Sequence, residues 1–257
     1  MLDIPTIVRS RGLSKTRNSS LLVLIPAYNE EQSVAEVIQG VRETLPETPI
    51  VVVDDGSLDG TAHQARQAGA EVIQLPHHLG LGGAVQTGYK FAFEHGFQRV
   101  VRVDGDGQHN AADIPALLAK MDEGDYDVVT GSRYIKKNGY SWHPIRRLGG
   151  LIFTAVLYPI LDQRITDPTS GFVAVNRRAL EVCSRSFPLE YPEIETLVVL
   201  KRNALRFCEI PARMFPRRRG QSSIGNWGAV YYMFRVLLGV FVNVIKYERR
   251  FHTGGSS

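Results

Sequence analysis

Cysteine is scarce in this sequence, and so are long uninterrupted apolar runs. Cys183 and Cys208 are the two cysteines among 257 residues, which argues against a disulfide framework and leaves no zinc-ligand spacing. Both fit a reducing compartment, where we expect them to be small buried apolar residues. The first 20 residues contain four basic side chains but no apolar stretch of signal-peptide length. We interpret residues 1–20 as a flexible basic arm.

The charge excess is also small, at +4. The arginines are not interleaved with an aromatic strand platform or a recognition-helix pattern, so a nucleic-acid-binding role is disfavoured. The charge is unevenly distributed, however, and its densest points are Arg146-Arg147 and Arg217-Arg218-Arg219. Such clusters indicate contact with phosphate groups or an anionic lipid surface.

Short apolar runs alternate with longer periodic stretches from Leu21 to Thr130, a pattern typical of βαβ units around a mostly parallel sheet. The sequence therefore predicts an α/β fold. The expected strands are Leu21 to Pro26, Ile50 to Asp54, Glu71 to Leu75, Arg99 to Asp104 and Asp127 to Thr130. The expected helices lie near Glu31 to Thr44, Thr61 to Ala68, Gly83 to His95 and Ala112 to Asp122. Ligands of such sheets collect at the carboxyl ends of the strands.

Two carboxylates, Asp104 and Asp106, follow the fourth expected strand on a turn with Gly105 and Gly107. Alternate side chains of an extended chain point the same way, so the two carboxylates can reach toward one point. Hard oxygen ligands suit Mg²⁺ or Mn²⁺ that also binds a substrate phosphate. Ordinary turn chemistry is the competing interpretation. An EF-hand is excluded, because Pro115 stands where its bidentate glutamate belongs.

The second expected strand ends at Asp54-Asp55, where the Asp55 carboxylate can accept hydrogen bonds from a nucleobase or ribose. Ser57 or Asp59 is expected to cap the following helix. The glycine-rich stretch from His77 to Ala84 departs from the dinucleotide-binding spacing, because Val85 stands where the third glycine belongs. Its glycines serve either tight packing of helix on sheet or an amide contact with a pyrophosphate.

The carboxyl-terminal stretch from Trp227 to Ile245 is apolar apart from one narrow polar stripe. Arg235 near its middle disfavours a lone transmembrane span. We expect an amphipathic helix that lies in the membrane interface or packs in a homo-oligomer, with plain core as the alternative. The apolar run from Leu148 to Leu161 is too short and interrupted for a span and is expected to be a core or interfacial helix.

Five motifs in order resemble the signature set of family 2 inverting glycosyltransferases of the GT-A fold. They are Pro26-Ala-Tyr-Asn-Glu30, Asp54-Asp-Gly-Ser57, Asp104-Gly-Asp106-Gly-Gln-His109, Gly131-Ser-Arg133 and Ser170-Gly171-Phe172. Within that family the chain most resembles the branch of polyprenol-phosphate (dolichol-phosphate) mannosyltransferases and bacterial envelope-polysaccharide transferases. That branch commonly carries a lysine after Gly-x-Ser, whereas this chain has Ser223 there. A lipid-phosphate acceptor and a hydroxyl acceptor both stay open.

The resemblance implies roles for the matching residues. The metal, Mg²⁺ or Mn²⁺, would bind Asp104 and Asp106. The nucleotide sugar would contact Pro26, Tyr28, Glu30, Val53, Asp55, Asp104, Gly105, Asp106, Arg133 and Arg217. The acceptor side would include Asp167, Ser170, Gly171 and Phe172. Glu193 or Glu195 could be a general base for a hydroxyl acceptor, with Asp167 as a third candidate; alternatively, both glutamates simply favour the amino-terminal dipole of a helix.

The resemblance implies an enzyme that moves a hexosyl group from a nucleotide-diphosphate sugar to a polyprenyl phosphate or lipid-linked saccharide in cell-envelope glycan synthesis. The alternatives are a non-catalytic nucleotide-sugar-binding scaffold and a sugar nucleotidyltransferase. We expect a catalytic domain over residues 21–223, with a nucleotide-sugar half (21–133) and an acceptor half (134–223), followed by a membrane or oligomerisation segment over 224–257. The expected location is peripheral, on the cytoplasmic face of the membrane.

Overall fold

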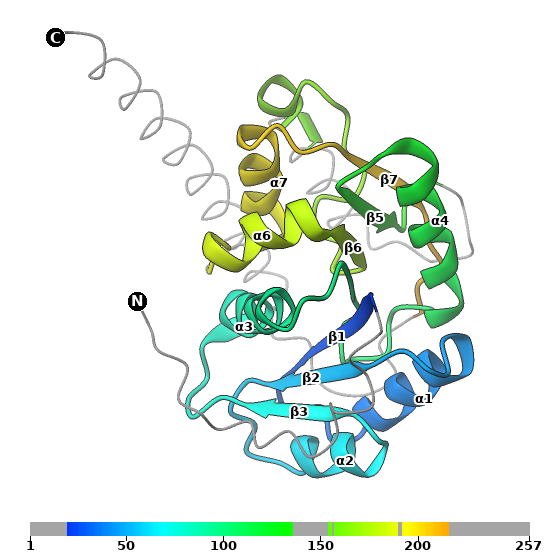
Figure 1. The fold of residues 1–257 in the computed structure, drawn as a ribbon, viewed down its shortest axis with the longest axis vertical. Helices are drawn as coiled ribbons and strands as arrows, with labels where there is room; N and C mark the ends of the chain where they lie inside the picture. The colour runs from blue at the N-terminus through cyan, green and yellow to red at the C-terminus, as the bar shows by residue number, and fades with distance from the viewer. Residues whose placement is uncertain (1–19, 136–153, 156, 190–191, 216–257) are drawn as a thin grey trace, which may run out of the picture.

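The computed structural model describes residues 20–135, 154–155, 157–189 and 192–215. They form an α/β fold around one seven-stranded sheet with the strand order β3-β2-β1-β4-β6-β5-β7 (Figure 1). The strands are β1 (Leu21–Ala27), β2 (Ile50–Asp54), β3 (Glu71–Gln74), β4 (Arg99–Arg102), β5 (Val128–Ser132), β6 (Val173–Asn176) and β7 (Phe207–Pro211). β6 is antiparallel to both of its neighbours, and the other pairs are parallel.

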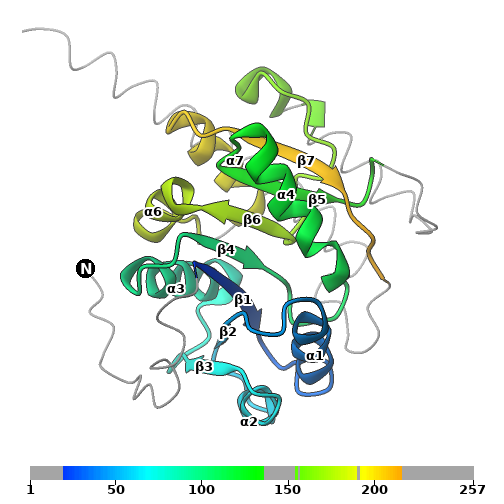
Figure 2. The same cartoon turned by 45° about the vertical axis from the view of Figure 1, so that its right-hand side comes forward.

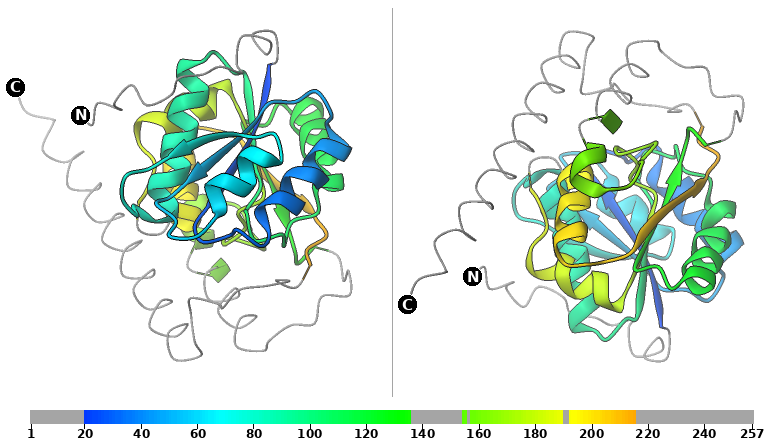
Figure 3. Two further views of the ribbon diagram at one scale, coloured as in Figure 1. Left: turned by 90° about the horizontal axis from the view of Figure 1, so that it is seen from below. Right: turned by 90° about the horizontal axis from the view of Figure 1, so that it is seen from above.

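Helices cover both faces of the sheet. They are α1 (Val34–Thr44), α2 (Thr61–Gln67), α3 (Gly80–Glu94), the 3-10 helix η2 (Ala111–Asp113), α4 (Ile114–Gly124), α6 (Arg177–Arg185) and α7 (Pro192–Arg202). Figure 2 shows α1 and α4 on one side of the sheet and α3 and α6 on the other. The two views of Figure 3 show the same division. This layering explains why β1 and β2 are buried along their whole lengths.

The two faces of β1 belong to two separate parts of the core. Leu22 and Leu24 lie in a cluster with residues of α3, α6 and α7. Val23 and Ile25 lie in a second cluster with residues of α1 and α4. This alternation follows from the period of two along a strand. The same alternation determines which helix layer the side chains just after a strand point toward.

The topology places the expected ligand crevice at β1. β1 pairs with β2 on one side and with β4 on the other. The strands from β1 to β3 are therefore added in one direction across the sheet, and β4 is added on the opposite side of β1. At such a switch point, the loops that follow the neighbouring strands diverge and leave a crevice at their carboxyl ends. The motifs at Tyr28, Asp55 and Asp104 follow these three strands.

The expected α/β fold with a mostly parallel sheet is confirmed, and all five expected strands occur within a few residues of their expected ends. β6 and β7 were not expected. The prediction that Ser57 caps α2 is wrong: α2 begins after Gly60, and the Ser57 hydroxyl accepts instead from the Asn29 amide. Asp59 accepts hydrogen bonds from the amide and hydroxyl of Thr61, the first residue of α2.

Several predictions fall on residues outside the described ranges: the basic arm over 1–19, half of the run from Leu148 to Leu161, Arg217, and the segment 224–257. Among the helices that the structure does describe, not one combines the length and the apolar character that crossing a membrane requires.

Candidate nucleotide-sugar site

The loops after β1 and β2 are tied to each other by hydrogen bonds between side chains and backbone. The Asn29 amide donates to the Ser57 hydroxyl at 2.9 Å, and the Leu58 amide donates back to the Asn29 carboxamide oxygen at 2.9 Å. A third bond runs from the Glu30 amide to the Thr61 hydroxyl at 2.8 Å. Asn29 has a φ of 54°, a left-handed conformation that asparagine tolerates better than most residues. The two motifs therefore form one rigid edge of the crevice.

Asp55 lies inside this edge, with a side chain that is 3% exposed. Its Oδ1 accepts the Leu79 amide at 2.8 Å. Burial raises the pKa of the Asp55 carboxyl, opposed in part by that amide and by the nearby imidazole of His78. The ring of His78 stacks on Tyr28, with centroids 3.9 Å apart and an angle of 29° between the planes. Tyr28, Asp55 and His78 thus form one small cluster.

Pro26 and Val53 lie in strands beside this cluster. The Val53 side chain is fully buried in the core, so its backbone is the part that can approach a nucleotide. The Glu30 carboxylate accepts the Ser33 hydroxyl at 2.7 Å, which fixes it at the start of the segment leading into α1. Pro26, Glu30 and Val53 thus lie in the segments next to Tyr28 and Asp55.

Asp104 is the second residue after β4, and its side chain is 30% exposed. The Asp104 amide donates to Nδ1 of the buried His109 at 3.1 Å, and the other ring nitrogen faces Oδ2 of Asp104 at 3.7 Å. Burial lowers the pKa of His109 to about 4, so the ring is neutral at pH 7. Its stack on the fully buried Phe172 fixes its orientation. His109 therefore positions the Asp104 backbone without adding a charge.

The turn after Asp104 lies directly on the end of β1. A Cβ atom added to Gly105 would stand 3.2 Å from the Pro26 carbonyl oxygen and 3.3 Å from the Ala27 Cβ, so little room is left for a side chain. Asp106 turns back on its own loop, where its Oδ1 accepts the Gln108 amide at 3.0 Å. The glycine brings the carboxylate turn against the Pro26-to-Glu30 motif.

A buried cation stands behind Asp104. The Arg102 side chain is 3% exposed; its Nε donates to the Gly171 carbonyl at 2.7 Å and lies 3.7 Å from Oδ1 of Asp104. A Cβ atom on Gly171 would fall 2.2 Å from Oδ2 of Asp104 and 2.8 Å from Nη2 of Arg102. A side chain at position 171 would have to displace one of these two groups. Gly171, expected on the acceptor side, therefore lies against Asp104, the expected metal-binding residue.

Arg133 and Asp167 form a bidentate ion pair. Nε and Nη2 of Arg133 donate to the two carboxylate oxygens at 2.7 and 2.6 Å, and the Asp167 side chain is 0% exposed. The backbone amides of Thr166 and Asp167 donate in turn to Glu209 at 2.6 and 2.7 Å. Burial raises the pKa of the Glu209 carboxyl. In this arrangement Arg133 and Asp167 are each other's partners. Ser170 is also buried, and its hydroxyl donates to the Gly131 carbonyl at 2.6 Å.

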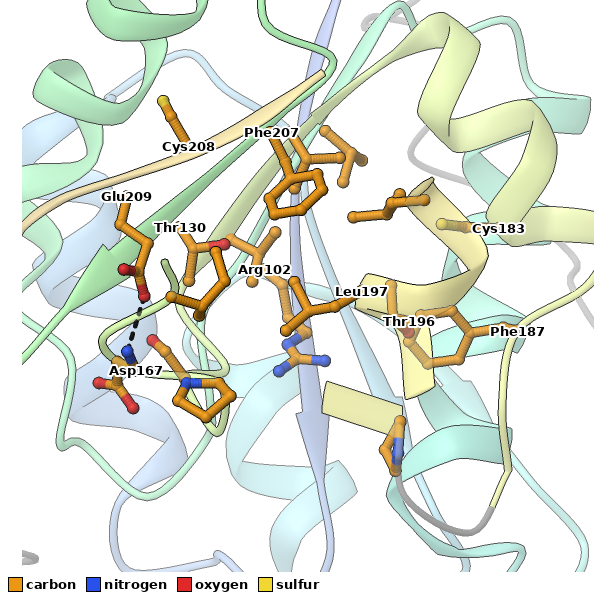
Figure 4. A pocket seen from close by; sticks show the side chains of 18 of the residues that line it. Arg102, Thr130, Asp167, Cys183, Phe187, Thr196, Leu197, Phe207, Cys208 and Glu209 are labelled. Carbon is orange, nitrogen blue, oxygen red and sulfur yellow. Dashed lines mark hydrogen bonds between the residues drawn. The ribbon is translucent and has the colours of Figure 1, made fainter. Parts of the chain in front are cut away.

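A largely apolar pocket extends from Arg102 to the helix α7 (Figure 4). Asp167, Ser170, Pro192 and Thr196 are among the residues that line it. Glu193 and Glu195 both lie in the first turn of α7, as expected. The pocket that Glu195 lines is a different one, shared with Phe187 and Arg202.

The segment after β7 returns to the turn that carries Asp104 and Asp106. Arg213 donates to Asp113 through its backbone amide and its guanidinium at 2.7 to 3.2 Å. The Phe215 amide donates to the Gln108 carbonyl at 2.8 Å, which holds Phe215 at the Asp106-to-His109 turn. Arg217 itself lies outside the described residues.

The carboxylates at this site offer a position for an ion such as Mg²⁺ but do not enclose the ion by themselves. Asp104 keeps Oδ1 buried with no hydrogen-bond donor among the described residues, a position that a cation could compensate. Within those residues there is no cluster of three or more His, Cys, Asp and Glu side chains able to enclose a metal. One or two carboxylates completed by substrate phosphates are the usual arrangement for Mg²⁺.

Comparison with known proteins decides the family. The model of glycosyl transferase family 2 matches residues 22–183, which include the three strand-end motifs. The chain belongs to glycosyl transferase family 2. Its relatives are named glycosyltransferases, and the protein is a glycosyltransferase.

Two relatives illustrate the likeness. The chain is 31% identical over 229 residues to a polyprenol monophosphomannose synthase of Mycolicibacterium smegmatis, covering 84% of each chain. It is 29% identical over 217 residues to an undecaprenyl-phosphate mannosyltransferase of Micrococcus luteus, covering 80% of this chain and 88% of the relative. A solved structure of glucosyl-3-phosphoglycerate synthase from Mycobacterium tuberculosis with Mn²⁺, UDP and glucosyl-3-phosphoglycerate has a TM-score of 0.66 at 20% identity, covering 95% of this chain and 86% of that one. This likeness confirms the GT-A fold.

The sequence pointed to Tyr28, Asp55, Asp104 and Gly171, which the structure brings to one edge of the sheet. It did not single out His78, Arg102, His109 or Glu209 as site residues. A weak signal existed for Arg102, since a charged residue interrupts the apolar strand that precedes Asp104. For Glu209 there was none, because its partners lie 42 and 43 positions away.

Proposed function

We propose that this family 2 enzyme transfers a hexosyl group, with inversion, from a nucleotide-diphosphate sugar to polyprenyl phosphate or a lipid-linked saccharide in cell-envelope glycan synthesis. The observation that carries the proposal is the convergence of Tyr28, Asp55 and Asp104 at the ends of three adjacent parallel strands. The names of the relatives support a polyprenyl-phosphate acceptor.

Different residues would bind different parts of the donor. The Tyr28 and Asp55 cluster would hold the nucleoside, and Asp104 and Asp106 would hold a Mg²⁺ or Mn²⁺ ion on the diphosphate. When bound, such an ion would stabilise the negative charge that develops on the departing phosphate oxygen. Arg102 adds a positive charge behind Asp104, at 3.7 Å from its carboxylate. Its hydrogen bond to Gly171 keeps that charge in place before the donor arrives.

The transfer itself would be a single displacement. An acceptor oxygen forms a bond to the anomeric carbon while the bond from that carbon to the nucleoside diphosphate breaks, and the configuration inverts. A phosphate acceptor is already ionised, whereas a hydroxyl acceptor must give its proton to a base. The candidates for that base are Glu193 and Glu195, in the first turn of α7.

A lipid-linked acceptor requires access to a membrane surface. We propose that the protein is peripheral on the cytoplasmic face and that the segment 224–257 provides the contact or a homo-oligomer interface, from its narrow polar stripe and following basic residues. Removing Trp227 to Ser257 should reduce co-sedimentation with anionic liposomes. Unchanged partition would refute this part of the proposal.

The test of the function is a thermal-shift panel of nucleotide sugars with Mg²⁺ and with Mn²⁺, followed by radiolabel transfer from the best donor to polyprenyl phosphate. A ligand that binds the native state raises the melting temperature. We expect a metal-dependent shift with one or a few donors and label in the lipid phase. Donor binding without transfer to any lipid would contradict the proposed lipid acceptor.

A further inference from the structure

The ring of His78 occupies the space between the two groups that are proposed to hold the nucleobase. One face of the ring lies on Tyr28 with centroids 3.9 Å apart. Its Nδ1 lies 2.8 Å from Oδ2 of Asp55 and 3.3 Å from the Asp55 carbonyl oxygen. A flat ring on Tyr28 with an N–H directed at Asp55 is also what a nucleobase would present. His78 therefore makes the same two interactions as the expected ligand.

The contact between His78 and Asp55 is short but imperfect. Oδ2 of Asp55 is buried and has no well-aligned hydrogen-bond donor among the described residues, although Nδ1 is close to it. Oδ1 is already engaged by the Leu79 amide. A base N–H that reached Oδ2 in good alignment would satisfy an acceptor that His78 leaves unsatisfied, and buried acceptors gain from such a bond.

Access to Asp55 depends on the His78 side chain. The Asp55 side chain is 3% exposed, whereas that of His78 is 51% exposed. The backbone beneath the ring is packed against Gly56, where an added Cβ would stand 3.0 Å from His77 C and His78 N. The backbone of this loop is thus held in place, while the imidazole has open solvent on its outer side into which it can rotate.

We propose that His78 occupies the nucleobase subsite of the free enzyme and that the base of the donor displaces it. This inference rests on the proposed function, which assigns Tyr28 and Asp55 to the base. His78 then weakens donor binding, because only molecules with the ring rotated away can accept the base. The affinity for the donor becomes a property of the His78 rotamer as well as of the contacts made by the base.

The experiment compares the full-length wild type, His78→Ala and the matched control His77→Ala, which removes a neighbouring exposed imidazole on the same loop. The probes are UDP and GDP, each with Mg²⁺, measured by isothermal titration calorimetry, and Mg²⁺-pyrophosphate as a ligand without a base. We expect His78→Ala to bind its nucleoside diphosphate about threefold to tenfold more tightly, as for a ring docked in about 70–90% of free molecules. His77→Ala should bind like the wild type, and pyrophosphate affinity should be the same for all three proteins.

The outcomes separate the inference from the function. If the wild type binds a nucleoside diphosphate and His78→Ala binds it equally or more weakly, the inference is overturned and the proposed function stands. An equal gain in pyrophosphate affinity also overturns it, because the effect would then not lie in the base subsite. Absence of binding to both UDP and GDP in the wild type and in His78→Ala overturns the inference and the proposed function together.

Discussion

Two buried carboxylates at the ends of the strands are compensated in different ways. In the part that we propose binds the donor (the donor side), Asp55 is buried against a half-exposed imidazole, and burial raises its pKa. In the part that we propose binds the acceptor (the acceptor side), Asp167 is also buried but receives two hydrogen bonds from Arg133 and holds it in one orientation. The difference indicates that the Asp55 carboxylate is available to a ligand, whereas the Asp167 carboxylate stabilises the fold through its ion pair with Arg133.

The largest effect on stability should come from breaking the acceptor-side pair. Asp167→Asn leaves the Arg133 guanidinium, 19% exposed, without its carboxylate, and disruption of a buried pair costs about 3 kcal/mol or more. The control is Asp125→Asn, which removes the 97% exposed partner of Arg206 and should cost less than about 0.5 kcal/mol. Urea unfolding measures both. Equal costs for the two variants would contradict the contrast between the two sides.

A smaller effect is expected where the two sides meet. Gly171→Ala forces a Cβ atom within 2.2 Å of Asp104 and 2.8 Å of Arg102, so it should destabilise by about 1–3 kcal/mol and lower metal-dependent turnover. Gly40→Ala is the control, because its Cβ would meet nothing closer than 3.8 Å within the helix α1. That change should be neutral or stabilising by up to about 1 kcal/mol. Normal turnover of Gly171→Ala would show that Asp104 tolerates displacement.

The smallest effect should come from the donor-side carboxylate. Asp55→Asn removes a buried charge while keeping an oxygen for the Leu79 amide, so the free energy of unfolding at pH 7 should change by less than about 1 kcal/mol. Both proteins should carry His78→Ala, so that only the residue at position 55 differs in charge at this contact. Because the pKa of Asp55 is raised in the folded state above 3.8, that state binds the proton more tightly. The aspartate's contribution to stability is then full below pH 3.8 and is lost as the pH rises through the folded-state pKa.

Urea midpoints measured from pH 4 to pH 7 test the sign of this effect. The protein with Asp55 should lose stability relative to the one with Asn as the pH rises. A relative gain with rising pH would mean that Asp55 is compensated in the native state as well as Asp167 is.

The donor side could be predicted from the sequence more fully than the acceptor side. On the donor side, β1, β2 and β4 are parallel strands whose apolar runs and end motifs are local, so Asp55 and Asp104 could be assigned to one edge without knowing any long-range pairing. The acceptor side depends on non-local pairing. β6 is a four-residue strand that pairs Val173 with Arg102, about seventy positions earlier, in the antiparallel direction, and no local pattern encodes that direction.

Side-chain pairing was harder to predict than backbone topology. Arg133 was expected to contact the nucleotide sugar, and the structure directs its guanidinium to Asp167. This pairing depends on how the 166–172 segment crosses the end of β5. His78 was read as part of a glycine-rich turn. Its position over Asp55 follows from close packing of that turn on Gly56, a contact that sequence spacing does not encode.

The central claim is that Asp104 anchors a metal and diphosphate during sugar transfer. Its most direct test is the rate of nucleoside diphosphate release from the best nucleotide sugar with polyprenyl phosphate, across a titration of Mg²⁺ or Mn²⁺, for wild type and Asp104→Asn with matched melting temperatures. We predict metal-dependent turnover in the wild type and a loss of about 100-fold or more in the variant. Turnover that needs no metal, or that survives in Asp104→Asn, would contradict the account.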